Sequence, residues 1–167
     1  MHLQEFFDYK NQLMKDILTT ESIVRLIDDN VAMENAKSLA YTKVFPYEYI
    51  PDTIQEGHTF VCFDVDIRRS INKMILMPVI YVWAFTHKSK MRLPNGEGVR
   101  IDRLCSAICE KINGSRYYGL GELEINSVDR FAPMNDFQGK CLTFYARDIG
   151  RQYNPNNPTP VNRRDGV

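Results

Sequence analysis

The sequence has no excess charge of either sign, because 21 Lys and Arg residues are matched by 21 Asp and Glu residues. A dedicated nucleic-acid binder usually carries a basic surface that neutralises phosphates. A neutral chain creates no such overall field, so sequence-independent binding to a nucleic-acid backbone is disfavoured. Neutrality also provides little repulsion between copies, which suits a protein whose surface is covered by neighbours.

Long hydrophobic runs are also missing, and none approaches the ~20 apolar residues that a membrane-spanning helix needs. No basic segment followed by an apolar one resembles a secretory signal. We therefore expect no membrane contact and synthesis in a reducing cytoplasm. The four cysteines fit this expectation, because they are scattered mostly within apolar patterns and no partner pair follows Cys105 and Cys109 at zinc-site spacing.

Familiar catalytic and cofactor motifs are absent as well. The chain contains no G-x-S-x-G nucleophile motif, and its three histidines, His2, His58 and His87, lie near no obvious nucleophile. The glycines of GLGEL, residues 119–123, lack the third glycine and the following helix of a dinucleotide site. These patterns indicate neither an enzyme nor a bound cofactor.

One short stretch, TFVCFDVDIRRS at residues 59–70, raises an enzymatic alternative. Asp64 and Asp66 would point to the same side of a strand, where a metal-dependent nuclease could use them to hold a cation. The further acidic residue, spacer and lysine that such a nuclease needs do not follow on an adjoining strand. The same alternation places four apolar residues on the opposite side: Val61, Phe63, Val65 and Ile67. We therefore interpret the two aspartates as the polar face of a half-buried strand and predict no metal site.

Hydrophobic spacing predicts three helical segments. An amphipathic helix covers residues 3–18, and a short helix capped by Thr20 follows it and ends near residue 30. The most regular stripe lies in an internal helix at residues 100–114. Before the first strand, prolines in the 44–52 region impose an extended path.

Four strands complete the pattern, at residues 59–67, 74–86, 121–131 and 140–149. The element order predicts an α+β fold: an antiparallel or mixed sheet of about four strands, with the N-terminal helical segment and the internal helix packed on one face. We expect a single domain at residues 1–149 and a Pro- and Asn-rich tail at residues 150–167.

The strand at residues 74–86 is apolar on both sides, so both of its faces must be covered. A helix can cover one face, but the other requires a second layer or another subunit, since monomers rarely expose so large an apolar patch. Pro78 removes one ladder donor and marks a bulge or an edge position. The predicted subunit interface consists of Ile75, Met77, Val79, Tyr81, Trp83 and Phe85.

Two polar segments are predicted to be contact arms. Residues 87–100 combine Pro and Gly with Lys88, Lys90 and Arg92 and are typical of a mobile loop, of which residues 88–98 form the predicted arm. Its basic residues could meet an acidic protein surface or, as the lesser option, make a weak, salt-sensitive contact with passing DNA. Residues 151–167 have a similarly core-free composition. Both lack the apolar residues needed to offset the ordering entropy, so we expect them to gain order only in an assembled particle.

Four stretches, KVFPYEYIPDTI, VIYVWAFTHK, GVRIDRLCSAICEKING and GLGELEI, resemble structural proteins of tailed bacteriophages. The element order is similar to that of the tail terminator family, also called tail-completion or tail-to-head joining proteins. The resemblance implies a homo-oligomeric ring, usually of six subunits, that sits on the tail tube protein, ends tube growth and meets the head and neck connector proteins. DNA would pass through its bore without sequence recognition.

These implications describe a structural protein of the virion neck, assembled in the host cytoplasm, with no catalytic residue, cofactor or metal. Another neck ring protein, for head closure or connection, is the alternative in the same setting. A metal-dependent nuclease using Asp64 and Asp66 is the alternative from a different class.

Overall fold

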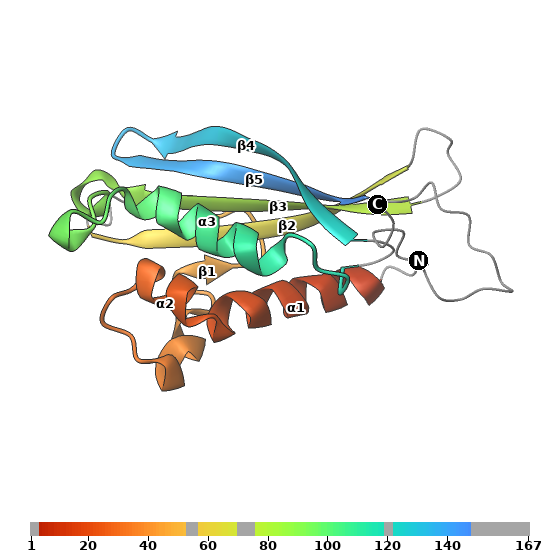
Figure 1. The fold of residues 1–167 in the computed structure, drawn as a ribbon, viewed down its shortest axis with the longest axis horizontal. Coiled ribbons are helices and arrows are strands. Elements are labelled where there is room, and N and C mark those ends of the chain that lie inside the picture. Colours follow the sequence, from red (N-terminus) through yellow and green to blue (C-terminus); the bar gives the residue numbers. More distant parts are fainter. Residues whose placement is uncertain (1–3, 53–56, 70–75, 119–121, 148–167) are drawn as a thin grey trace, which may run out of the picture.

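The computed structural model describes residues 4–52, 57–69, 76–118 and 122–147. These residues form a five-stranded mixed sheet with helices packed on it, which confirms the predicted α+β fold (Figure 1). The predicted tail at residues 150–167 lies outside the described residues. In chain order the elements are α1 (Gln4–Thr19), α2 (Glu21–Ile27), the 3-10 helix η1 (Met33–Leu39), β1 (Val44–Phe45), β2 (Thr59–Arg69), β3 (Leu76–His87), the 3-10 helices η2 (Lys88–Lys90) and η3 (Pro94–Gly96), α3 (Arg100–Ile112), β4 (Glu122–Met134) and β5 (Phe137–Arg147).

The strands are hydrogen-bonded in the order β1-β2-β3-β5-β4. The two-residue strand β1 runs parallel to β2, and all other neighbours are antiparallel. Pro78 lies opposite Ile67 of β2, whereas the β3–β5 pairing begins one residue later at Val79. Pro78 therefore lies beyond the described end of the β3–β5 ladder, although β3 itself is a central strand of the sheet rather than an edge strand.

The larger core lies between the helices and one face of the sheet. Leu13 and Ile17 of α1 and Leu104 and Ile108 of α3 are fully buried, because their spacing of four residues places them on one side of each helix. They pack in the same core as the alternate β3 residues Ile80, Val82 and Ala84, which are also fully buried. Helix α3 runs along β3 on one face of the sheet, and α1 and α2 lie near the β1–β2 edge (Figure 1).

A buried hydrogen bond holds α1 against the segment that follows α3. The Tyr118 hydroxyl donates to the Asp16 carboxylate at 2.6 Å. Burial raises the pKa of Tyr118 and the Asp16 contact adds to this, so the phenol stays protonated and remains a donor. Thr20 occupies the predicted N-cap position of α2, but its hydroxyl donates to the Asp16 carbonyl oxygen instead of capping the helix.

A second, aromatic core covers one end of the other sheet face. Its buried residues are Phe45, Phe60, Cys62, Phe85 and Phe137. Gly139 of β5 lies between Phe85 and Phe131 in the strand pairing, and the rings of these two residues contact each other edge to face at a centroid distance of 5.6 Å. A Cβ at position 139 would lie 2.0 Å from the carbonyl oxygen of Ala84. Only glycine therefore fits this close approach.

Candidate functional site

Beyond the aromatic core, the same sheet face is only partly covered by the chain. Directly opposed residues of antiparallel strands share a face, so the pairing defines this surface. We call it the open sheet face; its described members include Asp64, Asp66, Tyr81, Trp83, Asp129, Cys141, Thr143 and Tyr145. Tyr81 and Trp83 are half-buried, and their rings stack at a centroid distance of 5.8 Å.

The residues of the predicted subunit interface have different environments in a single chain. Phe85 is fully buried by the aromatic core, and Val79 is only 7% exposed. Met77 lies opposite Arg68 of β2, and Ile75 lies outside the described residues. The sequence did not reveal that residues distant along the chain, such as Phe45 and Phe137, cover Phe85. Tyr81 and Trp83 are thus the half-buried centre of the predicted interface.

Asp64 and Asp66 lie on β2 as predicted, on the face opposite the buried Val61, Phe63 and Val65. The Asp64 carboxylate is 2.6 Å from the Lys10 Nζ of α1 and accepts a hydrogen bond from the Val65 amide at 2.8 Å. Asp66 is exposed. Among the described residues, no three His, Cys, Asp or Glu side chains gather in a group that could hold a metal ion.

The open sheet face already binds one guanidinium group. Arg68 lies over the Tyr81 ring, with 5.9 Å between its Cζ and the ring centroid, and donates a hydrogen bond to the Tyr81 hydroxyl. A guanidinium is attracted to the negative face of an aromatic ring and stacks on it. The Tyr81 ring is therefore paired with a guanidinium group of the same chain.

The predicted contact loop, residues 88–98, has defined hydrogen bonds within the chain. The Leu93 amide donates to the Gly98 carbonyl oxygen at 2.9 Å, and the Arg100 amide donates to that of Met91 at 2.8 Å. Leu93 is buried, which supplies apolar contact that composition alone did not reveal. The loop is thus more ordered in a single chain than we expected from its sequence.

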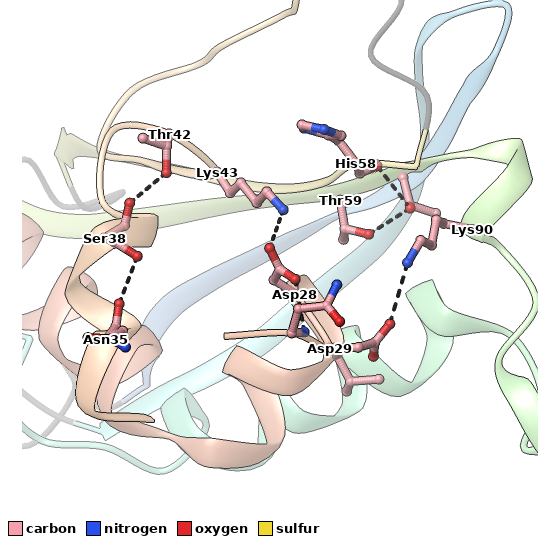
Figure 2. Close-up of polar contacts among 12 residues, drawn as sticks. Asp28, Asp29, Asn35, Ser38, Thr42, Lys43, His58, Thr59 and Lys90 are labelled. Atoms are coloured by element: carbon pink, nitrogen blue, oxygen red, sulfur yellow. Dashed lines mark hydrogen bonds and ion pairs between the residues drawn. The ribbon is translucent and has the colours of Figure 1, made fainter. Parts of the chain in front are cut away.

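The three basic residues of this loop differ in their partners. Lys88 forms an ion pair with Asp136 of the β4–β5 turn. Lys90 lies 3.6 Å from an Asp29 carboxylate oxygen, as Figure 2 shows. The Arg92 side chain is exposed and has no polar partner in the part of the chain that the structure describes.

Arg100 attaches this loop to the helices, and sequence reasoning missed it. Its guanidinium is almost fully buried and donates to the carbonyl oxygens of Leu26 and Lys90 and to both carboxylate oxygens of Asp29, at 2.9–3.2 Å. A buried charge needs such complete pairing. Beside it is an open pocket of about 480 Å³, which we call the basic pocket; its lining includes Asp29, Lys90, Arg92, Leu93, Pro94 and Arg100.

A second cluster of polar side chains, Asp28, Lys43 and His58, lies close to this loop near the start of β2 (Figure 2). Burial alone would raise the pKa of Asp28, but hydrogen bonds from Lys43 and from the Asn30 amide outweigh it and lower that pKa. Burial lowers the pKa of His58, the charge of Lys43 adds to this effect, and Asp28 opposes it only in part. Within the described residues, the buried His58 Nδ1 has no hydrogen-bond partner.

The cysteines behave as structural thiols. Burial raises the pKa of Cys62 and of Cys105 to about 12, so both remain protonated at neutral pH. Burial also raises the pKa of Cys109 and of Cys141. None of the helices in the described part of the chain has the length and apolar character needed to cross a membrane.

Comparison with known proteins gives the chain a family. A family model described as YomW matches residues 9–146. Because the match covers well over half of the 167 residues, the chain belongs to the YomW family, a family of proteins from Bacillus phage regions. No curated protein matches the chain at a significant level. A family from phage regions agrees with the phage setting that the sequence resemblance implied, and it does not specify a tail terminator.

Proposed function

We propose that the protein is a structural virion protein of a tailed phage and acts as its tail terminator. Copies of the chain form a ring, usually of six subunits for such proteins, that caps the tail tube and joins it to the head and neck. DNA passes through the bore of this ring without sequence recognition. Membership in a phage-region family supports the setting.

The main observation behind the proposal is a pair of stacked rings, Tyr81 and Trp83. The chain covers both only in part, so they remain half-buried on the open sheet face. Aromatic side chains with a polar end are enriched in protein interfaces. A stable interface buries about 800 Å² on each partner, so it would extend beyond these two rings over neighbouring residues of the sheet face. A head-to-tail contact of this kind generates a ring when the rotation closes.

Electron microscopy and native mass spectrometry of the purified protein test the proposal. We expect rings for the wild type, monomers for Tyr81→Glu, and rings for the control Tyr117→Glu. Tyr117 is a suitable control because it is 77% exposed and lies on the connection between α3 and β4, away from the open sheet face. Circular dichroism of each variant confirms that it is folded.

A tube-growth assay tests the specific role. Adding the protein to polymerising tail tube protein should shorten the tubes and place rings at their ends. Rings that leave tube length unchanged would overturn the terminator assignment in favour of another neck ring protein. A folded wild-type monomer at high concentration that joins no tube would overturn the whole proposal.

A further inference from the structure

We propose that the open sheet face of one copy binds the basic loop at residues 88–98 of a second copy, with Arg92 beside Tyr81 and Trp83. This inference rests on the proposed function, because it specifies which two surfaces meet in the ring. It joins two surfaces that are separate in a single chain. The contact is between a guanidinium donor and a surface that combines aromatic rings with carboxylates.

The open sheet face carries a net negative charge, because the Arg68 guanidinium offsets only one of its exposed carboxylates. Asp66 and Asp129 are exposed, and Glu48 of the segment after β1 is exposed nearby. The buried Cys62 thiol donates to the carbonyl oxygen of Tyr49 at 3.7 Å, which places the neighbouring Glu48 beside this face. Asp64 is neutralised by Lys10, so it does not contribute to the excess.

The face also has the geometry for a second arginine. Arg68 occupies the Tyr81 ring from the β2 side, while Trp83 lies one row further along β3, opposite Cys141. Tryptophan provides the strongest aromatic surface for a cation. Asp129, opposite Cys141 on β4, lies in the same row and supplies a carboxylate for the guanidinium N–H groups.

The loop supplies the matching cation. Arg92 is exposed without a polar partner among the described residues, whereas Lys88 and Lys90 each have a carboxylate close by. Because hydrogen bonds and the buried Leu93 hold the loop, Arg92 is presented by a preorganised segment. Preorganisation reduces the entropy lost on binding. The basic pocket beside Arg92 offers room for a carboxylate of the partner's face.

In a single chain the loop is held on the helix side of the sheet, where Lys90 and Arg100 contact Asp29. The loop follows His87 at the end of β3, while Asp66 lies opposite Val79, eight residues earlier on the same strand. At 3.3 Å per residue this separation is about 26 Å. The loop then leads into α3, which packs on the other face of the sheet. The contact is therefore between two copies, through two different surfaces, as a head-to-tail ring requires.

Charge reversal in two complementary variants tests this contact. The loop variant is Arg92→Glu and the face variant is Glu48→Lys with Asp66→Lys; each should weaken assembly by about tenfold or more in midpoint concentration, since like charges then meet. An equimolar mixture should assemble again, because each reversed loop meets a reversed face and each unchanged loop meets an unchanged face. Native mass spectrometry of the mixture should show rings with equal numbers of the two variants.

The control is Arg163→Glu with Arg164→Glu, which reverses two arginines of the C-terminal segment and should leave assembly unchanged. If this control abolishes assembly while Arg92→Glu does not, the C-terminal segment is the occupant and the inference is overturned. If both charge variants still form the rings seen for the wild type, the proposed contact is overturned, whereas the proposed ring is not. A wild-type dimer that the variants dissociate would support the contact and overturn the ring.

Discussion

The two faces of the sheet differ in how the chain covers them, and β3 shows the difference residue by residue. On the helix side, Ile80, Val82 and Ala84 are fully buried. On the other side, Phe85 in the aromatic core and Val79 are buried, whereas Trp83 and Tyr81 between them are half-buried. An apolar strand thus serves two purposes: one face stabilises the monomer, and the other is partly kept for a contact outside it.

The polar residues follow the same division. Among the charged groups near the helix face, Arg100 donates four hydrogen bonds within the chain, and Asp16 accepts from Tyr118. On the open sheet face, Asp66 is exposed and the Arg68 guanidinium lies on a tyrosine ring. Complete internal pairing is what stability requires, because an unpaired buried charge is costly. Exposed charges beside aromatic rings instead favour recognition of another surface.

The largest predicted difference between the two faces is in the free energy of unfolding, when neighbouring β3 residues that point to opposite faces are each changed to alanine. We expect Ile80→Ala to reduce the free energy of unfolding by about 2–5 kcal/mol, because it leaves a cavity in the larger core. Tyr81→Ala should cost about 1 kcal/mol, since that side chain is half-buried. Urea unfolding at a concentration too low for assembly measures both. Equal losses would contradict the division between the faces.

Sequence alternation was sufficient to predict much of this arrangement. Strict alternation in β2 predicted that Val61, Phe63 and Val65 are buried and that Asp64 and Asp66 lie on the other side, and the structure confirms both. The four-residue spacing in α3 predicted its buried stripe in the same way. Each of these patterns is a property of one local segment, so it can be read without knowing the fold.

Contacts between distant segments could not be read from such patterns. Arg100 and Asp29 are 71 residues apart, and Asp64 is paired with Lys10 of α1. The burial of Phe85 depends on Phe45 and Phe137, which reach it only through the strand order. A basic residue at a helix start gives no sequence signal of its burial, because exposed arginines are common at such positions. The half-covered second face therefore emerges only from the tertiary structure.

We expect an intermediate loss of stability when Gly139 is changed, because it lies where the aromatic core meets the open sheet face. Gly139→Ala should reduce the free energy of unfolding by about 1–3 kcal/mol, because the added methyl group would overlap the backbone at Ala84 and Phe85. The control Gln138→Ala changes an exposed neighbour on the same strand and should have an effect of less than about 0.5 kcal/mol. Thermal or urea unfolding compares the two. Full tolerance of Gly139→Ala would mean that β3 and β5 can separate here without loss of packing.

The smallest effect should be a pH dependence at the covered end of the second face, where the His58 ring lies 6.0 Å from that of Phe60. Burial and the charge of Lys43 hold the pKa of folded His58 below its ordinary value of 6.5. As the pH falls through 6.5, the unfolded chain binds a proton before the folded chain does, so stability falls with pH. The contribution is present above pH 6.5 and is lost as the pH approaches the lower pKa of the folded state.

Urea unfolding at pH 7.5 and pH 5.5 isolates this contribution when wild type is compared with His58→Gln, whose side chain does not titrate. We expect the wild type to lose more stability than the variant between these two values. The neighbouring Asp28 does not obscure the comparison, because its pKa is lowered from 3.8 and its titration therefore falls below this window. An equal loss in both proteins would show that His58 is as free to take a proton in the folded chain as in the unfolded one. In that case the covered end of this face would be as open to water as the rest of it.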